Sequence, residues 1–194
     1  EDFFIIVGRM TPGKGIAEAI RIANKAGARL LIVGHVTSHL PWSEEYFLKQ
    51  VKPHIDGKRI CYIERLPYHE VVQLMGRAKG FLFPLQWDEP FGMVVVEAMA
   101  AGTPVIAYPR GSMPELIRHG ETGYLVENTP EAWREGLLEL AGDDQLRTTI
   151  ARRAREAVLS GRTLAHCATA WAEAIDHIAD DLELDAIPVA GLRG

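Results

Sequence analysis

Short apolar runs alternate with amphipathic stretches along most of the chain. The runs show no internal alternation of polar residues, which is typical of strands buried on both faces of a sheet. They predict strands at 3–7, 29–33, 59–63, 80–85, 104–108 and 123–126. Between and after them, apolar residues at helical spacing predict helices at 13–25, 43–52, 68–78, 90–101, 114–118, 130–141, 143–159 and 163–182.

This order of elements predicts an α/β fold, a doubly wound, Rossmann-like parallel sheet with helices on both faces. Ligands of such sheets bind outside the carboxyl ends of the strands. The loops that follow the predicted strands are therefore the places where function is expected.

The composition fits one globular domain. With 194 residues and 47% hydrophobic content, the chain can bury one substantial core. We assign residues 1–184 to this domain and residues 185–194, which hold turn residues without periodicity, to a flexible C-terminal tail. The first apolar run begins at residue 3 of a chain that lacks an initiator Met, which favours an excised domain.

Charge, cysteine content and apolar run length exclude several classes. A net charge of −5 without a basic cluster argues against nucleic-acid binding. The longest apolar stretch is interrupted by Glu97, Gly102 and Pro104, so no membrane-spanning segment is predicted. Cys61 and Cys167 are interpreted as core thiols of a reducing compartment, which predicts a cytoplasmic protein. A membrane-peripheral location of the full-length protein stays an alternative.

The segment "VGRMTPGKGI", residues 7–16, has the position of a phosphate loop between a strand and a helix. Gly8, Gly13 and Lys14 fit the pattern G-x-x-x-x-G-K of nucleoside-triphosphate loops. Gly15, however, stands where that motif needs a Ser or Thr hydroxyl for magnesium. Pro12 also removes a backbone N–H from the phosphate cradle. We therefore reject an ATPase.

A dinucleotide loop is excluded as well, because Gly13 and Gly15 lack the third glycine of G-x-G-x-x-G. What remains is a loop with two cations, Arg9 and Lys14, beside a helix N-terminus whose free N–H groups favour an anion. The alternative is that both are ordinary solvated charges.

The stretch from Trp87 to Ala107 holds a helix, predicted at 90–101, that is apolar nearly all round and therefore expected to be buried. Glu97 is an exception that needs a hydrogen-bonding partner or a ligand. Glu89 precedes the helix, and with Pro90 at the first helical position it is, taken alone, better explained by helix capping. Glu97 follows Glu89 by eight positions, so a continuous helix would place the two carboxylates roughly 12 Å apart, suited to the two ends of one elongated ligand.

Together, "GRMTPGKG", "EPFGMVVVE", "AMAAGTPVIA" and "GSMPELIRHGETGYLV" resemble the C-terminal, donor-binding domain of the retaining glycosyltransferases of family 4, which have the GT-B fold. The motifs match in order and spacing from about Val7 to Val126. The fold implied is one half of a GT-B enzyme. The activity implied is transfer of a sugar from a nucleoside-diphosphate sugar, with no cofactor and no metal.

The resemblance also implies residue roles. Arg9 and Lys14 would hold the diphosphate and act in catalysis together with Glu89, which would take hydroxyls of the transferred sugar. Glu97 would take the ribose hydroxyls. Backbone N–H groups at 91–93 would meet the sugar and the distal phosphate. The donor-binding set is then Gly8, Arg65, Phe91, Gly92, Met93, Val94 and Glu97.

Fixed cations fit this chemistry, because transfer builds negative charge on the departing phosphate. Arg9 and Lys14 would take the part of a magnesium ion, and the chain has no Asp-x-Asp motif.

Several further residues have two interpretations. Arg65 either stacks on the base or is a solvated loop charge. Trp87 either lines the sugar pocket or is buried against the sheet edge. His35 and His39 follow the second strand, where a surface position is favoured over a donor contact.

A turn after the fifth strand departs from the family. Ser112 replaces the usual second glycine of its Gly-Gly-x-Pro-Glu turn, and Glu115 is interpreted as a helix-start acid.

The family's N-terminal domain, which supplies the acceptor site, is absent from this chain. We expect the isolated domain to bind a donor without transferring the sugar, and the acceptor is not readable. Two alternatives remain: a non-catalytic module that binds a sugar nucleotide, and a nucleotide-sugar epimerase of the same fold.

Overall fold

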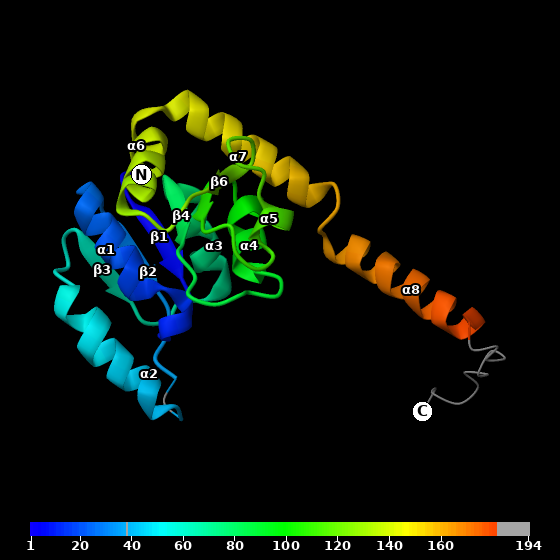
Figure 1. Cartoon of the computed structure of the whole chain (residues 1–194), viewed down its shortest axis with the longest axis horizontal. Coiled ribbons are helices and arrows are strands. Elements are labelled where there is room, and N and C mark those ends of the chain that lie inside the picture. The colour runs from blue at the N-terminus through cyan, green and yellow to red at the C-terminus, as the bar shows by residue number, and fades with distance from the viewer. Residues whose placement is uncertain (38, 182–194) are drawn as a thin grey trace. The chain divides into compact units, whose positions relative to one another are not determined.

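The computed structural model describes residues 1–37 and 39–181 (Figure 1). Its sheet has six parallel strands in the order β3-β2-β1-β4-β5-β6. The strands are β1 (Phe4–Val7), β2 (Leu30–Val33), β3 (Ile60–Ile63), β4 (Gly80–Phe83), β5 (Val105–Ala107) and β6 (Gly123–Leu125). This confirms the doubly wound α/β fold, and the strand order reverses between β1 and β4.

The helices follow the predicted order. They are α1 (Ile16–Ala26), α2 (Pro41–Tyr46), α3 (Tyr68–Arg77), α4 (Met93–Ala100), α5 (Met113–Leu116), α6 (Pro130–Gly142), α7 (Asp144–Leu159) and α8 (Leu164–Asp181). Short 3-10 turns lie at Pro12–Lys14 and Lys52–His54, and α2 continues as a π-helical turn over Phe47–Val51. The predicted single helix at 43–52 is thus a composite.

One face of the sheet packs against α1 and α6. Alternate strand residues such as Phe4 and Ile6 point to this face and join a core that includes Ile20 of α1 and Trp133 of α6. Ile150 of α7 completes it. This arrangement explains why the strands lack polar alternation, since both faces are covered.

The opposite face packs against α3, α4 and α5. Ile5 and Phe81 point to this face and contact a second core that includes Met75 of α3 and Val95 of α4. Ala154 of α7 belongs to this second core. Because α7 joins both cores, it ties the two helical layers to one sheet.

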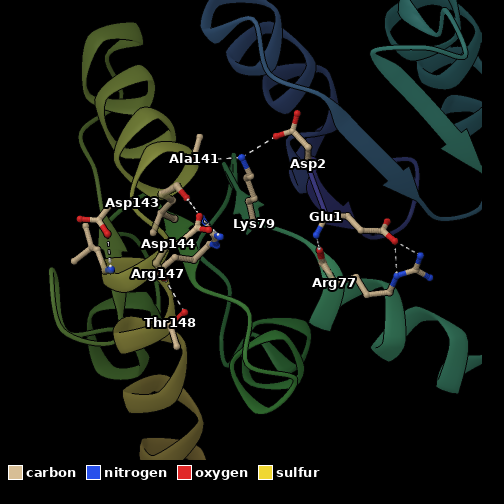
Figure 2. A network of polar contacts seen from close by, with 11 residues as sticks. Glu1, Asp2, Arg77, Lys79, Ala141, Asp143, Asp144, Arg147 and Thr148 are labelled. Carbon is tan, nitrogen blue, oxygen red and sulfur yellow. Dashed lines mark hydrogen bonds and ion pairs between the residues drawn. The ribbon is translucent and has the colours of Figure 1, made fainter.

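Polar contacts fasten α6 and α7 at the amino ends of the strands (Figure 2). Lys79, just before β4, donates to the Ala141 carbonyl at 3.1 Å and pairs with Asp2 at 2.8 Å. Arg147 of α7 donates to the Leu140 carbonyl at 2.7 Å and pairs with Asp144 at 2.6 Å. These contacts lie away from the carboxyl ends of the strands, where ligands of such sheets bind.

The chain divides into two compact units, residues 1–158 and residues from 159 onward. In the second unit, α8 exposes Leu164, Trp171, Ile175 and Ile178. The predicted tail at 185–194 lies outside the described residues. Over residues 1–37 and 39–181, no helix combines the length and apolar character needed to cross a bilayer.

The prediction that both cysteines are core thiols is wrong. Cys61 is half-buried and Cys167 is exposed. Cys61 lies in β3, one of the two edge strands, where three of the four residues are only half-buried. Cys167 lies on α8, whose described side chains are largely exposed.

Candidate donor-binding site

A cavity of about 470 Å³ opens at the carboxyl ends of β1, β2 and β3. It is lined by Gly8 and Arg9 after β1, by His35 after β2 and by Arg65 after β3. The structure therefore brings three of the predicted donor-binding residues to one cavity. His35 is half-buried and lines this cavity, whereas His39 is exposed, as the surface interpretation predicted.

The predicted phosphate loop ends at Gly15, a position that only glycine can occupy. Gly15 has φ 70° and serves as N-cap residue of α1. A Cβ on Gly15 would lie 2.0 Å from the Pro84 carbonyl oxygen. The loop after β1 therefore packs directly on the segment after β4, and the two halves of the expected site are in contact.

Lys14 and Glu89, which are 75 residues apart in the chain, form an ion pair in this contact. The Lys14 ammonium donates to Glu89 Oε2 at 2.6 Å, and the two side chains are only 18% and 15% exposed. The same ammonium lies 5.4 Å from the centre of the Trp87 ring. Trp87 is 42% exposed, so its interpretation as a buried residue of the sheet edge is wrong.

The capping interpretation of Glu89 is also wrong. Helix α4 begins at Met93, with Gly92 as N-cap residue at φ 88°, and not at Pro90. Glu89 consequently lies in the loop before the helix, and the estimate of carboxylate separation along one helix does not apply. Apolar periodicity extended the predicted helix too far because Phe91 continues the pattern although it is outside the helix.

The start of α4 presents the predicted backbone donors at the carboxyl edge of the sheet. Phe91 and Met93 expose their side chains by 46% and 61%, and Val94 is half-buried. The first N–H groups of a helix have no partner within it and favour an anion. This arrangement can bind a phosphate or a sugar hydroxyl beside Glu89.

Glu97 is half-buried one turn further along α4. Burial raises the pKa of its carboxyl above 4.5, and a hydrogen bond with the Tyr68 side chain opposes that rise. Tyr68 is the first residue of α3 and is 63% exposed. Sequence reasoning missed Tyr68. It directly follows the loop after β3, and loops after the strands are where ligands of such sheets bind, so its position could have marked it as a candidate.

Ser112 supports the loop that carries Glu89. Its hydroxyl donates to the Phe91 carbonyl at 2.7 Å, and its backbone N–H donates to the Glu89 carbonyl at 3.0 Å. Glu115 lies in the first turn of α5, as the helix-start interpretation predicted. The departure from the family turn therefore supplies a hydroxyl contact that a glycine lacks.

Metal-ligating side chains do not gather in the described part of the chain. Among those residues, no group of three His, Cys, Asp or Glu is placed to hold a metal ion.

Comparison with known families decides the classification. Residues 1–157 match the family model described as glycosyl transferases group 1. The chain belongs to this family. A D-inositol 3-phosphate glycosyltransferase of Corynebacterium efficiens is 34% identical over 172 residues, which cover 84% of this chain and 39% of that protein. The chain thus spans about two fifths of the length of this curated relative.

Solved structures agree with the fold. Sucrose-phosphate synthase from Thermosynechococcus elongatus superposes with a TM-score of 0.82 at 23% identity, over 93% of this chain and 46% of that one. HepE of Anabaena, solved in complex with UDP and glucose, gives a TM-score of 0.68 at 25% identity, over 81% of this chain and 44% of that one. The fold is the α/β unit of GT-B glycosyltransferases.

Proposed function

We propose that the chain is the donor-binding domain of a retaining, family 4 hexosyltransferase that uses a nucleoside-diphosphate sugar. The observation that carries this proposal is the direct contact of Lys14 with Glu89 beside the cavity that Arg9 lines. A cation for the diphosphate and a carboxylate for the sugar thereby lie at one point of the sheet edge, next to the switch in strand order.

Each part of the donor then has a place. The base and ribose enter the cavity between the loops after β1 and β3, near Arg65 and Glu97. The diphosphate lies between Arg9, Lys14 and the N-terminus of α4. The sugar reaches Glu89. HepE, a structural neighbour solved with UDP and glucose, supports a ligand of this class.

The same groups favour the reaction. Negative charge grows on the departing phosphate as the glycosidic bond breaks, and preorganised cations and N–H groups stabilise that charge. Arg9, Lys14 and the start of α4 supply both without requiring a metal ion. Glu89 orients the sugar through its hydroxyls.

Transfer itself requires a longer protein, because the acceptor must be held on the open side of this site. We propose that an N-terminal domain supplies that surface and that the chain alone binds the donor without transferring it. Acceptor-dependent release of nucleoside diphosphate by the full-length protein, with retained anomeric configuration in the product, tests this part.

Binding by the chain is tested with thermal shifts in a panel of UDP, GDP, ADP and their sugar conjugates. Only a ligand that binds the native state raises the melting temperature. Arg9→Ala should lower the affinity for the tightest-binding ligand and make that affinity less dependent on salt concentration. Arg21→Ala, a cation on α1 paired with Glu18, is the matched control and should change neither. The donor-site assignment is refuted if no member of the panel shifts the melting temperature.

A further inference from the structure

Trp87 is an exposed aromatic residue fastened to the phosphate loop. A Cβ on Gly13 would lie 3.4 Å from Trp87 Cδ1, so the ring packs against the bare backbone of Gly13. The neighbouring Gln86 N–H donates to the Gly13 carbonyl at 2.9 Å. The ring is therefore held in place while 42% of the side chain stays accessible.

Lys14 is restrained on several sides in this arrangement. A Cβ on Gly8 would lie 3.6 Å from Lys14 Cγ, which places the Lys14 stem against the end of β1. Its ammonium has two partners, the Glu89 carboxylate at 2.6 Å and the Trp87 ring at 5.4 Å from the ring centre. The two partners differ in one respect. A sugar hydroxyl can replace Lys14 as the hydrogen-bond donor to the Glu89 carboxylate, whereas it does not displace Lys14 from the Trp87 ring.

We propose that Trp87 is a positioning residue that keeps the Lys14 ammonium at the diphosphate when the donor's sugar draws Glu89 away from it. The inference rests on the proposed function, since it assumes that Lys14 meets a diphosphate. Without a second holder, the released lysine would regain its four side-chain rotations, and ordering it again on the phosphate would weaken binding. A cation over an indole face keeps its attraction whatever Glu89 binds.

The strength of this contact sets the expected effect. Cation–π contacts in partly desolvated sites change an equilibrium by about threefold to thirtyfold. Trp87→Leu should lower affinity for the diphosphate by a factor within that range. Trp87→Phe retains a ring that attracts the ammonium more weakly, and it should lower this affinity less. Glu89 also orders Lys14, although it competes with the phosphate for the ammonium. Trp87→Leu should therefore lower affinity for the diphosphate by a larger factor in a Glu89→Gln background than in the wild-type background.

The experiment is a double-mutant cycle read by calorimetric titration with inorganic pyrophosphate and with UDP. Trp87→Leu is combined with Lys14→Gln and, separately, with Glu89→Gln. In the Lys14→Gln background, Trp87→Leu should change nothing, because the group it positions is gone. Trp42→Leu, which removes a similarly exposed tryptophan from α2, is the control and should leave both affinities unchanged.

The outcomes separate the two proposals. A Trp87→Leu loss of equal size with and without Lys14 would mean that Trp87 only packs the loop, and would overturn the positioning role while leaving the donor site standing. An unchanged affinity in Trp87→Leu and Trp87→Phe, with Lys14→Gln weakened, overturns it in the same way. Absence of binding of both probes to the wild-type chain overturns the proposed function and this inference with it.

Discussion

The Lys14–Glu89 pair makes Glu89→Gln the most informative single substitution. In the free site the two side chains neutralise each other at 2.6 Å. A diphosphate must take Lys14 from Glu89, and a sugar must take Glu89 from Lys14. Removal of the carboxylate charge therefore has two effects, one on every ligand with a diphosphate and one only on ligands with a sugar.

The two effects separate in a ratio. With side chains less than a fifth exposed, the pair is stronger than a surface ion pair. A diphosphate that binds Glu89→Gln no longer has to break this pair, which saves about 1 kcal/mol. Affinity for nucleoside diphosphate should therefore rise about fivefold. The sugar loses a charge-assisted hydrogen bond of about 1.5 to 3 kcal/mol. Both ligands carry a diphosphate and gain equally from the free Lys14, so this gain cancels in the ratio of their affinities. The preference for intact donor over nucleoside diphosphate should therefore fall about tenfold to a hundredfold.

Calorimetric titration of the chain with nucleoside diphosphate and with the intact donor measures this ratio. Asp88→Asn is the matched control, since it removes a carboxylate one residue earlier whose side chain is 76% exposed and paired with Arg110. It should leave the ratio unchanged. An unaltered ratio in Glu89→Gln, whatever happens to the separate affinities, would refute the assignment of Glu89 to the sugar.

Three further predictions concern the fold and the ribose contact. Gly15→Ala should lower the free energy of unfolding by about 2 to 4 kcal/mol in thermal melts, because its Cβ would meet the Pro84 carbonyl oxygen. Gly27→Ala, at nearly the same φ but with open space around it, should lower it by about 1 kcal/mol, and equal losses would contradict the clash. Thr103→Val should lower the free energy of unfolding by about 1 to 3 kcal/mol, because it removes the buried hydrogen bond of 2.6 Å from the Thr103 hydroxyl to the Met75 carbonyl. Thr149→Val on α7 is the control and should change the free energy of unfolding by no more than about 0.5 kcal/mol. Since burial raises the pKa of Glu97 above 4.5, nucleoside-diphosphate affinity should begin to fall on acidification above that pH, and Glu97→Gln should remove this step. The same shift favours the protonated carboxyl in the fold, so the contribution of Glu97 to stability without ligand is greatest below pH 4.5 and is lost as the pH rises.

The fold was largely predictable because its strands are buried on both sides. Strand β1, for instance, alternates Phe4 and Ile6 toward one core with Ile5 toward the other, so every position must be apolar. Such runs show where strands lie without any knowledge of their partners. Helix ends were less certain, since Phe91 is as apolar as a helical core residue although it lies before α4.

The site was predictable as a set of residue types and not as a set of contacts. Arg9 and Arg65 line one cavity because the carboxyl ends of parallel strands meet at one edge. The pairing of Lys14 with Glu89 depends on β1 lying beside β4, a neighbour relation between strands distant in the sequence. Local periodicity carries no information on that relation.

This adjacency also links the strand order to the chemistry. Helices α1 and α4 follow neighbouring strands, so the loops that precede them meet at the switch point. The Gly15 backbone contacts the Pro84 carbonyl there, and the Gln86 N–H binds the Gly13 carbonyl. A cation from one loop and a carboxylate from the other are thus fixed by main-chain contacts before any ligand arrives. Diphosphate and sugar would then bind to groups whose relative position the sheet has already set, which limits the ordering that the donor itself must supply.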